Sequence, residues 1–353
     1  MILTEQKNVV TGTQPEKFWK IVSPIAALIL GILFCVIVLW GAELALRWFD
    51  VAGSPYKKHY PKGYFVINEH GITGTSPGSH RVYTENLKTE KVIYDVIYSF
   101  DAYGWRVTPV INEKEKHQFL LFLGCSFTLG EGVHENETLA YYTAQLASDY
   151  DPYNYGFHGN GPFDILAKWE TEDLSKQVKE KKGIILYTFI DNHIRRLVGS
   201  TALIEWNKDR VYYRAAKSGE LIRAGSFMSA RPFLMKTYKF LSELRLLKVF
   251  KIEIPGEIRN KDIELAARVI EAIQHRAAEQ FPGTPFYVVF YPRMEYTKKL
   301  IPYLEKKNIR YLDYSQLFNR RKPEYYLSEE DKHPSALAYQ TLARAIVKDL
   351  NLR

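Results

Sequence analysis

The stretch that decides the fold is residues 124–133, GCSFTLGEGV, which directly follows the apolar run FLLFL at residues 119–123. Consecutive apolar residues that end in a turn of small residues indicate a buried β-strand. The turn presents the hydroxyl of Ser126 at the carboxyl end of that strand. Open α/β sheets bind their ligands at this end. We therefore expect Ser126 to belong to a functional site, provided that a base, an orienting carboxylate and oxyanion donors follow later in the chain.

Strand and helix patterns alternate through the chain from about residue 116. The sequence predicts strands at 118–123, 153–155, 184–190, 286–291 and 310–314, and helices from about 136, at 162–179, at 262–280 and at 336–350. Near-continuous apolar strands separated by helices indicate a parallel sheet that is covered on both faces. We therefore expect an α/β domain over residues 116–353.

Two stretches depart from this alternation. Residues 47–115 are rich in Tyr, Gly, His and Pro, and alternating runs such as 91–100 predict a small β-rich segment that packs on the main domain. Residues 200–258 form an insertion whose second half, 233–250, is predicted to be helical. This helix either packs on the core, which is the commoner case, or forms a lid or a membrane-facing surface.

A segment without charged residues, 21–42, precedes these regions. It is long enough to span a bilayer core of about 30 Å, whereas a cleaved signal peptide has an apolar core of about 7–15 residues. We expect an N-terminal tail at 1–20 and an uncleaved transmembrane anchor at 21–46. Because basic residues flank both sides equally, the orientation rests on the short tail and the long body. These favour a cytoplasmic N-terminus and a body on the periplasmic or cell-surface side.

Charge and cysteine content exclude some classes of protein. The 353 residues include 48 Lys and Arg against 40 Asp and Glu, a net charge of +8. The basic residues are scattered and form no block with interleaved aromatic residues, so no nucleic-acid partner is expected. Of the two cysteines, Cys35 lies in the uncharged segment and Cys125 in the serine turn, so no disulfide is expected between them.

Four separated segments have the residue types of one active site. Besides Ser126, they are residues 154–162, NYGFHGNGP, residues 189–193, FIDNH, and residues 330–335, EDKHPS. A serine hydroxyl needs an adjacent base, and a carboxylate shortly before a histidine suits the orienting acid and base of a triad. Glycines after a strand let a backbone amide approach a ligand, and a side-chain amide can donate to an oxyanion. Each segment alone also fits an ordinary turn or helix cap.

Taken together, the four segments resemble the SGNH, or GDSL-type, hydrolase superfamily. Its first block, Gly-Asp-Ser followed by Thr and small residues, is matched by 124–130, and its second block by Asn154 and Gly159. Its third block, Gly-x-Asn-Asp, resembles 190–193, and its last block, Asp-x-His before Pro and a helix, is matched by 331–334. The resemblance implies a flavodoxin-like three-layer α/β/α SGNH fold with a parallel sheet. Here that fold would follow one transmembrane helix and a β-rich juxtamembrane segment.

The resemblance also implies a reaction, two-step acyl transfer with neither metal nor cofactor. Ser126 would be the nucleophile, His333 the base and Asp331 the orienting carboxylate, and the backbone amides of Ser126 and Gly159 with the side-chain amide of Asn192 would form the oxyanion hole. The expected protein is a membrane-anchored serine esterase or related O-acyltransferase. Its substrate would be an acetyl or longer acyl ester of an envelope glycan or lipid.

Three residues depart from the family pattern. Cys125 replaces the Asp before the serine, and we interpret it as a small turn residue, with a thiol nucleophile as the alternative. The third block lacks its Gly, and His193 follows Asn192. Glu330 is the alternative to Asp331 as orienting carboxylate; Asp331 is preferred because Asp-x-His spacing occurs in the family.

Two other functions compete with this one. His158, Asp191, His193 and His333 are a possible metal-ligand set, but they have no recognised His-x-x-x-His or Cys-x-x-Cys spacing. A catalytically inactive SGNH scaffold that serves as a binding or assembly protein at the membrane is the second alternative. The altered third block favours it, since a fold does not guarantee a function.

Overall fold

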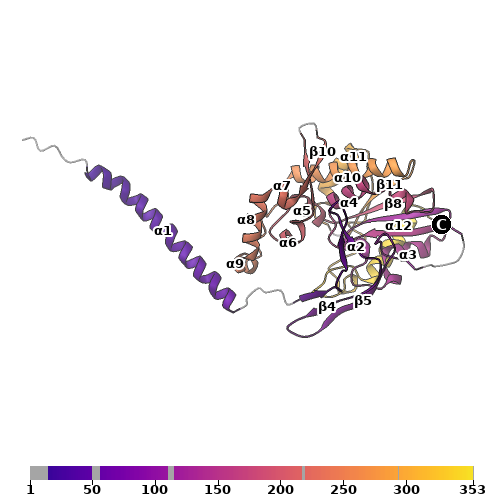
Figure 1. The fold of residues 1–353 in the computed structure, drawn as a ribbon, viewed down its shortest axis with the longest axis horizontal. Coiled ribbons are helices and arrows are strands. Elements are labelled where there is room, and N and C mark those ends of the chain that lie inside the picture. The colour runs from indigo at the N-terminus through magenta and orange to yellow at the C-terminus, as the bar shows by residue number, and fades with distance from the viewer. Residues whose placement is uncertain (1–14, 50–55, 110–114, 217–218, 293, 353) are drawn as a thin grey trace, which may run out of the picture. The chain divides into compact units, whose positions relative to one another are not determined.

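The computed structural model describes residues 15–49, 56–109, 115–216, 219–292 and 294–352. The chain forms two compact units, one of Met1–Gly53 with Leu244–Ile252 and one of Ser54–Glu243 with Glu253–Arg353 (Figure 1). Of the predicted tail and β-rich segment, residues 1–14, 50–55 and 110–114 lie outside the described residues.

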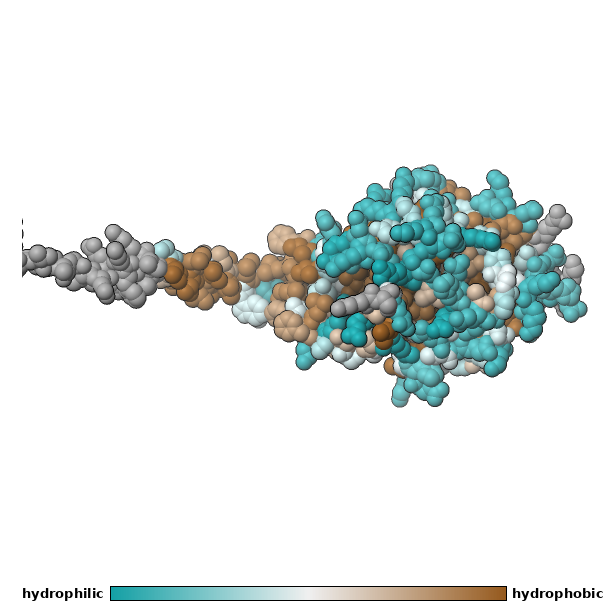
Figure 2. Space-filling view, turned by 90° about the horizontal axis from the view of Figure 1, so that it is seen from above, coloured by the Kyte–Doolittle hydropathy of each residue, from teal (hydrophilic) through white to brown (hydrophobic). Residues whose placement is uncertain are grey.

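The first unit contains the long helix α1, Pro15–Trp48, and the short helix α9, Arg245–Val249. The part of α1 from Pro24 to Trp48 is long and apolar enough to cross a membrane, and Figure 2 shows its apolar side chains as brown surface. Within it, the buried Glu43 accepts hydrogen bonds at both carboxylate oxygens from α9. The backbone amide of Arg245 lies 2.8 Å from Oε1 and that of Leu246 lies 2.9 Å from Oε2. Glu43 therefore caps α9 and ties it to α1.

The core of the second unit is a five-stranded parallel sheet in the spatial order β12-β11-β8-β6-β7. Its strands are β6 (Gln118–Gly124), β7 (Tyr150–Gly156), β8 (Lys182–Phe189), β11 (Phe286–Phe290) and β12 (Arg310–Asp313). Counted from the β7 edge, the order is 2-1-3-4-5, which is the flavodoxin-like order. The predicted fold class is confirmed, and the switch point of the sheet lies between β6 and β8.

Helices cover both faces of this sheet, because alternate side chains of β6 enter two different cores. Residues 119, 121 and 123 belong to one core and residues 120 and 122 to the other. The first core also takes side chains from α4 (Pro162–Thr171), α5 (Asn192–Val198), α10 (Asn260–Gln280) and α11 (Thr297–Lys306). The second takes them from α3 (Leu139–Leu146) and α12 (Ala336–Asp349), which completes the three α/β/α layers.

Residues 56–109 are β-rich, as predicted. Strands β1 (Tyr56–His59), β4 (Gly78–Asn86) and β5 (Val92–Phe100) form an antiparallel sheet, and β2 (Phe65–Ile67) pairs with β3 (Thr73–Thr75). The buried Arg106 follows them and donates to the carbonyls of Leu129, Gly130 and Val133 at 2.6–2.8 Å. This side chain ties the β-rich segment to the turn that carries Ser126.

Two predicted helices end earlier than the sequence suggests. The helix predicted at 162–179 stops at Thr171, since Gln280 of α10 donates to the carbonyls of Trp169 and Glu172 at 2.9 Å and accepts from the amide of Leu174. The helix predicted at 233–250 is instead two helices, α8 (Pro232–Glu243) and α9, because Glu43 caps a new start. The insertion also contains α6 (Ile204–Asn207), β9 (Val211–Ala215), β10 (Leu221–Ser226) and α7 (Phe227–Ala230).

Candidate active site

Ser126 is placed by the sharp turn that ends β6. Gly124 has a φ of +152°, and a Cβ there would lie 2.2 Å from Oγ1 of Thr128, so only glycine fits. Cys125 continues in extended conformation, and Ser126 begins the four-residue helix α2, Ser126–Leu129. The serine thus lies at the carboxyl end of β6, beside the switch point of the sheet, where folds of this order bind their ligands.

A series of hydrogen bonds joins Ser126, His333 and Asp331. Oγ of Ser126 lies 2.8 Å from Nε2 of His333, and Nδ1 of His333 lies 2.5 Å from Oδ1 of Asp331. The same Oδ1 accepts from the backbone amide of His333 at 3.0 Å. The carboxylate thereby holds the proton on Nδ1 and leaves the lone pair of Nε2 facing the serine, which is the arrangement of a nucleophile, a base and its orienting acid.

The carboxylate beside His333 is Asp331 and not Glu330, which was the alternative. Asp331 is buried, whereas the side chain of Glu330 is exposed. Burial by itself raises the pKa of Asp331. The hydrogen bond and charge of His333 and the charge of Lys58 outweigh burial, so the net pKa is lowered and Asp331 is ionised at neutral pH.

A second carboxylate, absent from the predicted site, faces the same histidine. Oε2 of the buried Glu131 lies 3.6 Å from Nε2 of His333 and 2.9 Å from Nδ1 of His158, and Oε1 pairs with Lys58 of β1. Burial raises the pKa of Glu131, but its interactions with His333, with Lys58 and with Nδ1 of His158 outweigh burial and hold that pKa well below its ordinary value. Glu131 is therefore an ionised group inside the site.

His158 links this carboxylate to the β-rich segment. Its Nε2 lies 2.7 Å from the hydroxyl of Tyr64, and its Nδ1 faces Glu131. Burial lowers the pKa of His158 although Glu131 acts against it, so the ring is neutral at pH 7. The network then assigns the proton to Nδ1, which donates to Glu131, while Nε2 accepts from Tyr64.

The sequence carried one signal for these additional residues. Glu131 stands between two glycines in the stretch that also holds Ser126. A single acidic residue in a turn of small residues next to the serine indicates a candidate site residue. Lys58 gave no such signal, because it lies 73 residues before Glu131 and reaches it only through the pairing of β1 with β4.

A pocket of about 490 Å³ opens beside Ser126 and His333. One wall comes from the β-rich segment and another from the ends of the parallel strands. The remaining lining residues are Tyr56, Lys58, Thr84, Ile93, Phe127, Ile190, Asn192, Arg196, Arg320, Glu330, Asp331 and Lys332. The pocket is thus shared between the α/β domain and the segment that follows the apolar helix.

The three predicted oxyanion donors lie in different settings. Asn192 begins α5, is exposed and lines the pocket. Gly159 lies after β7 with a φ of +61°, and its carbonyl accepts from Nε1 of Trp206 at 2.9 Å. A Cβ at Gly159 would lie 1.9 Å from the same indole nitrogen, so the position requires glycine. The amide of Gly159 and that of Ser126 remain predicted donors.

Three other residues that the sequence singled out do not line the pocket and are held by core packing or by hydrogen bonds. Cys125 is buried in the core with α3 and α12. Asp191 accepts from the backbone amides of Glu295 and Tyr296, and His193 is buried against the hydroxyl of Tyr187 at 2.8 Å. These positions account for the changed third block by local packing.

The alternative metal-ligand set is not assembled within the residues that the structure describes. There, the group of potential ligands close enough to share one ion consists of Glu131, Asp331 and His333. His158, Asp191 and His193 lie outside that group. Its own members already bond to one another and to Ser126.

Neither a family model nor a curated protein sequence matches the chain. Among solved structures, it is similar to a lipolytic protein of the G-D-S-L family from Veillonella parvula, at 10% identity and a TM-score of 0.41, over 66% of this chain and 98% of that one. An acetyl xylan esterase from Butyrivibrio proteoclasticus aligns at 13% identity and a TM-score of 0.41, over 68% and 65% of the two chains. An acetyl-xylooligosaccharide esterase from Geobacillus aligns at 17% identity and a TM-score of 0.40, over 67% and 96%. This chain is thus similar in structure to a G-D-S-L lipolytic protein and to acetyl xylan esterases.

Proposed function

We propose that this chain is a membrane-anchored serine esterase, or a related acyl-transfer enzyme, that acts on an acetyl or longer acyl ester of an envelope glycan or lipid. The observation that carries the proposal is the hydrogen-bonded series of Ser126, His333 and Asp331 beside an open pocket at the switch point of the sheet. A nucleophile, a base and an orienting acid in this order are the groups that serine-dependent acyl transfer uses.

The proposed reaction has two steps. Oγ of Ser126 attacks the ester carbonyl carbon while Nε2 of His333 takes its proton, and the carbonyl oxygen becomes an oxyanion met by Asn192 and by backbone amides. The tetrahedral intermediate expels the alcohol, which takes the proton from His333 and leaves an acyl-serine. Water or a sugar hydroxyl then gives its proton to His333 and attacks the acyl-serine. The acid or the new ester leaves, and Oγ of Ser126 recovers the proton from His333.

The proposed anchor is α1, with the N-terminus in the cytoplasm and the body outside it. An apolar helix near an N-terminus can also be a signal sequence. The contacts of Glu43 favour an α1 that stays part of the mature protein, because the amides of Arg245 and Leu246 would lose their acceptors if α1 were cleaved off. Protease added to intact spheroplasts should degrade the body; a body that stays uncut until the membrane is opened would overturn this orientation.

The activity is tested on the full chain in detergent with 4-nitrophenyl acetate, butyrate and octanoate. Ser126→Ala and His333→Ala should abolish hydrolysis and keep the unfolding midpoint close to that of the wild type. Ser175→Ala, in the short 3-10 helix Leu174–Lys176, is the matched control and should retain full activity. A fluorophosphonate should label wild-type Ser126 alone among the serines. Absence of both turnover and label in folded protein would favour the alternative, an inactive binding or assembly protein at the membrane.

A further inference from the structure

The pocket beside Ser126 carries more positive than negative side chains. Its lining includes Lys58 of β1, Arg196 of α5, Arg320 after β12 and Lys332, together with the acidic residues Glu330 and Asp331. The cations come from four separate parts of the second unit. Basic residues that are distant in sequence therefore converge on this pocket.

Two of these cations are already neutralised. Lys58 pairs with Glu131 and lies 3.9 Å from Oδ2 of Asp331, and Lys332 lies 2.6 Å from Oε2 of Glu329. An ammonium group in such a pair has little charge to offer a ligand. The excess positive charge of the pocket therefore lies on the two guanidinium groups.

Arg320 and Arg196 have no carboxylate partner within hydrogen-bonding or ion-pairing distance among the described residues. Half-buried Arg320 makes no side-chain hydrogen bond there, while Nη1 of Arg196 donates to the carbonyl of Asn160 at 2.7 Å and its Nε is buried without a partner. Burial raises the pKa of Asp191, and the charge of Arg320 acts against this rise. The carboxylate of Asp191 nevertheless accepts its hydrogen bonds from the backbone amides of Glu295 and Tyr296.

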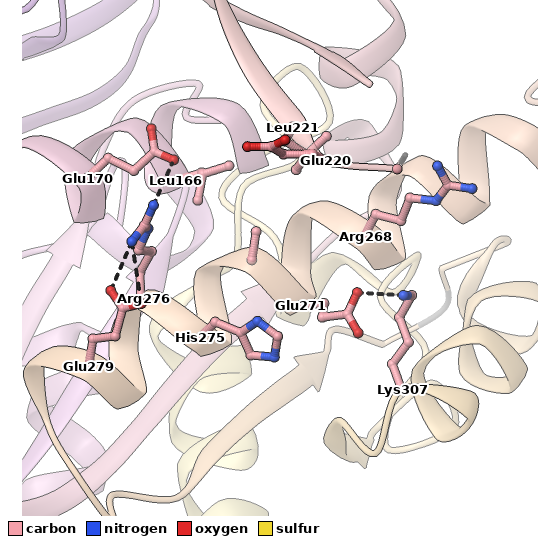
Figure 3. A pocket seen from close by; sticks show the side chains of 12 residues that line it. Leu166, Glu170, Glu220, Leu221, Arg268, Glu271, His275, Arg276, Glu279 and Lys307 are labelled. Atoms are coloured by element: carbon pink, nitrogen blue, oxygen red, sulfur yellow. Dashed lines mark hydrogen bonds and ion pairs between the residues drawn. The ribbon is translucent and has the colours of Figure 1, made fainter. Parts of the chain in front are cut away.

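Another pocket of the second unit, of about 570 Å³, shows the contrasting case (Figure 3). It lies between α4 and α10, and it also holds several cations. There Arg276 pairs with Glu279 at 3.0 Å and Lys307 with Glu271 at 2.5 Å. Arg268, which also lines this pocket, pairs with Glu264 at 2.6 Å. Each Lys and Arg side chain of its lining thus has a carboxylate partner, so the pocket offers no unpaired cation to an anionic ligand.

We infer that the pocket beside Ser126 receives an ester that carries a carboxylate or phosphate close to its scissile carbonyl, with Arg320 as the main contact of that anion. The inference rests on the proposed function and narrows its substrate class. A partly desolvated guanidinium without a carboxylate is costly, and its planar fork matches the oxygens of carboxylate and phosphate groups. Arg196 of α5, which lines the same pocket, adds a second positive charge.

The test uses three acetate esters that differ in one substituent: 4-acetoxybenzamide, 4-acetoxybenzoate and 4-acetoxyphenyl phosphate. The full chain in detergent should cleave one or both anionic esters with a kcat/KM about tenfold or more above that of the amide, after correction for spontaneous hydrolysis. Arg320→Gln should lower the ratio of anionic to neutral kcat/KM about tenfold. Arg321→Gln, the adjacent exposed arginine outside the pocket, should leave that ratio unchanged. The two anionic esters separate a carboxylate ligand from a phosphate ligand.

Equal ratios in wild type and Arg320→Gln, or equal changes in the two arginine variants, would overturn the inference while the esterase activity stands. Absence of turnover on all three esters would instead count against the proposed function. Calorimetric titration of the full chain with 4-hydroxybenzoate, phenyl phosphate and neutral 4-hydroxybenzamide then decides the inference. Anion binding that Arg320→Gln removes supports it, and the absence of any difference between anion and amide overturns it.

Discussion

Oε2 of Glu131 lies 3.6 Å from Nε2 of His333, the same nitrogen that faces the hydroxyl of Ser126. A buried, ionised carboxylate therefore stands on the serine side of the histidine, while Asp331 holds its other nitrogen. Both charges favour an imidazolium during proton transfer. Glu131 also joins the β-rich segment to the turn after β6, so it affects stability as well as the site.

Glu131→Gln should destabilise the chain by about 1–3 kcal/mol at neutral pH, because Lys58 and His158 lose a charged acceptor and the lysine still reaches solvent. The pKa of Glu131 is depressed on folding, so its stabilisation is complete above the ordinary value near 4.5 and is lost as pH falls below it. Urea midpoints in detergent at pH 7 and pH 4 should show a difference between wild type and variant that shrinks at the lower pH. Glu69→Gln, at an exposed position, controls for the loss of one charge; an equal effect there would contradict the prediction.

Asp331→Asn should lower kcat by about 10³–10⁴-fold, because the amide no longer holds the proton on Nδ1 of His333. Glu330→Gln, one residue earlier and exposed, should retain wild-type activity. The comparison is made with 4-nitrophenyl esters under saturating substrate. A loss in Glu330→Gln as large as that in Asp331→Asn would reverse the assignment of the orienting acid.

Asn192→Ala should lower kcat by about 10²–10³-fold, the usual cost of losing one oxyanion donor, without lowering the unfolding midpoint. Its side chain is exposed in the pocket, so no packing is lost. Asp191→Ala should behave in the opposite way and destabilise the chain by about 1–3 kcal/mol, since two backbone amides lose their acceptor. Parallel kinetics and thermal melts separate the two effects, and an unchanged kcat in Asn192→Ala would remove it from the oxyanion hole.

Cys125→Ala should keep its esterase activity and lose about 1 kcal/mol of stability or less, because the thiol is packed in the core and does not face the pocket. Iodoacetamide should leave wild-type activity intact, and mass spectrometry of the folded protein should find Cys125 unmodified. Inactivation that tracks alkylation of Cys125 would restore the thiol nucleophile as an alternative.

Glu43→Ala should loosen α9, because the amides of Arg245 and Leu246 lose the caps that are worth about 0.5–2 kcal/mol in total. Limited proteolysis of the full chain in detergent should then cleave within 244–252 faster than in wild type. Glu43→Gln keeps a side-chain carbonyl acceptor, so its cleavage rate should lie between those of wild type and Glu43→Ala. Identical cleavage in all three proteins would show that this contact does not hold the segment.

The sequence predicted the fold, and it named Ser126, Asp331 and His333, which the structure brings together. Apolar runs such as 119–123 identify the strands, and the local spacing of Asp331 and His333 identifies an acid and a base without knowledge of the fold. Long-range contacts were not predictable in this way. The break between α8 and α9 depends on Glu43, about 200 residues earlier in the chain, and the end of α4 depends on Gln280. Lys58 enters the site only through the pairing of two antiparallel strands.

The position of Lys58 limits how far the site can stand from a bilayer. It follows Trp48, the last residue of α1, by ten residues, and a fully extended chain spans at most about 3.6 Å per residue. With α1 in a membrane, the backbone of Lys58 stays within about 36 Å of the end of that helix. The residues between Trp48 and Lys58 then act as a short tether. Esters held at the bilayer surface would meet the pocket at a high effective concentration, whereas an ester farther away than the tether reaches would have to diffuse to it.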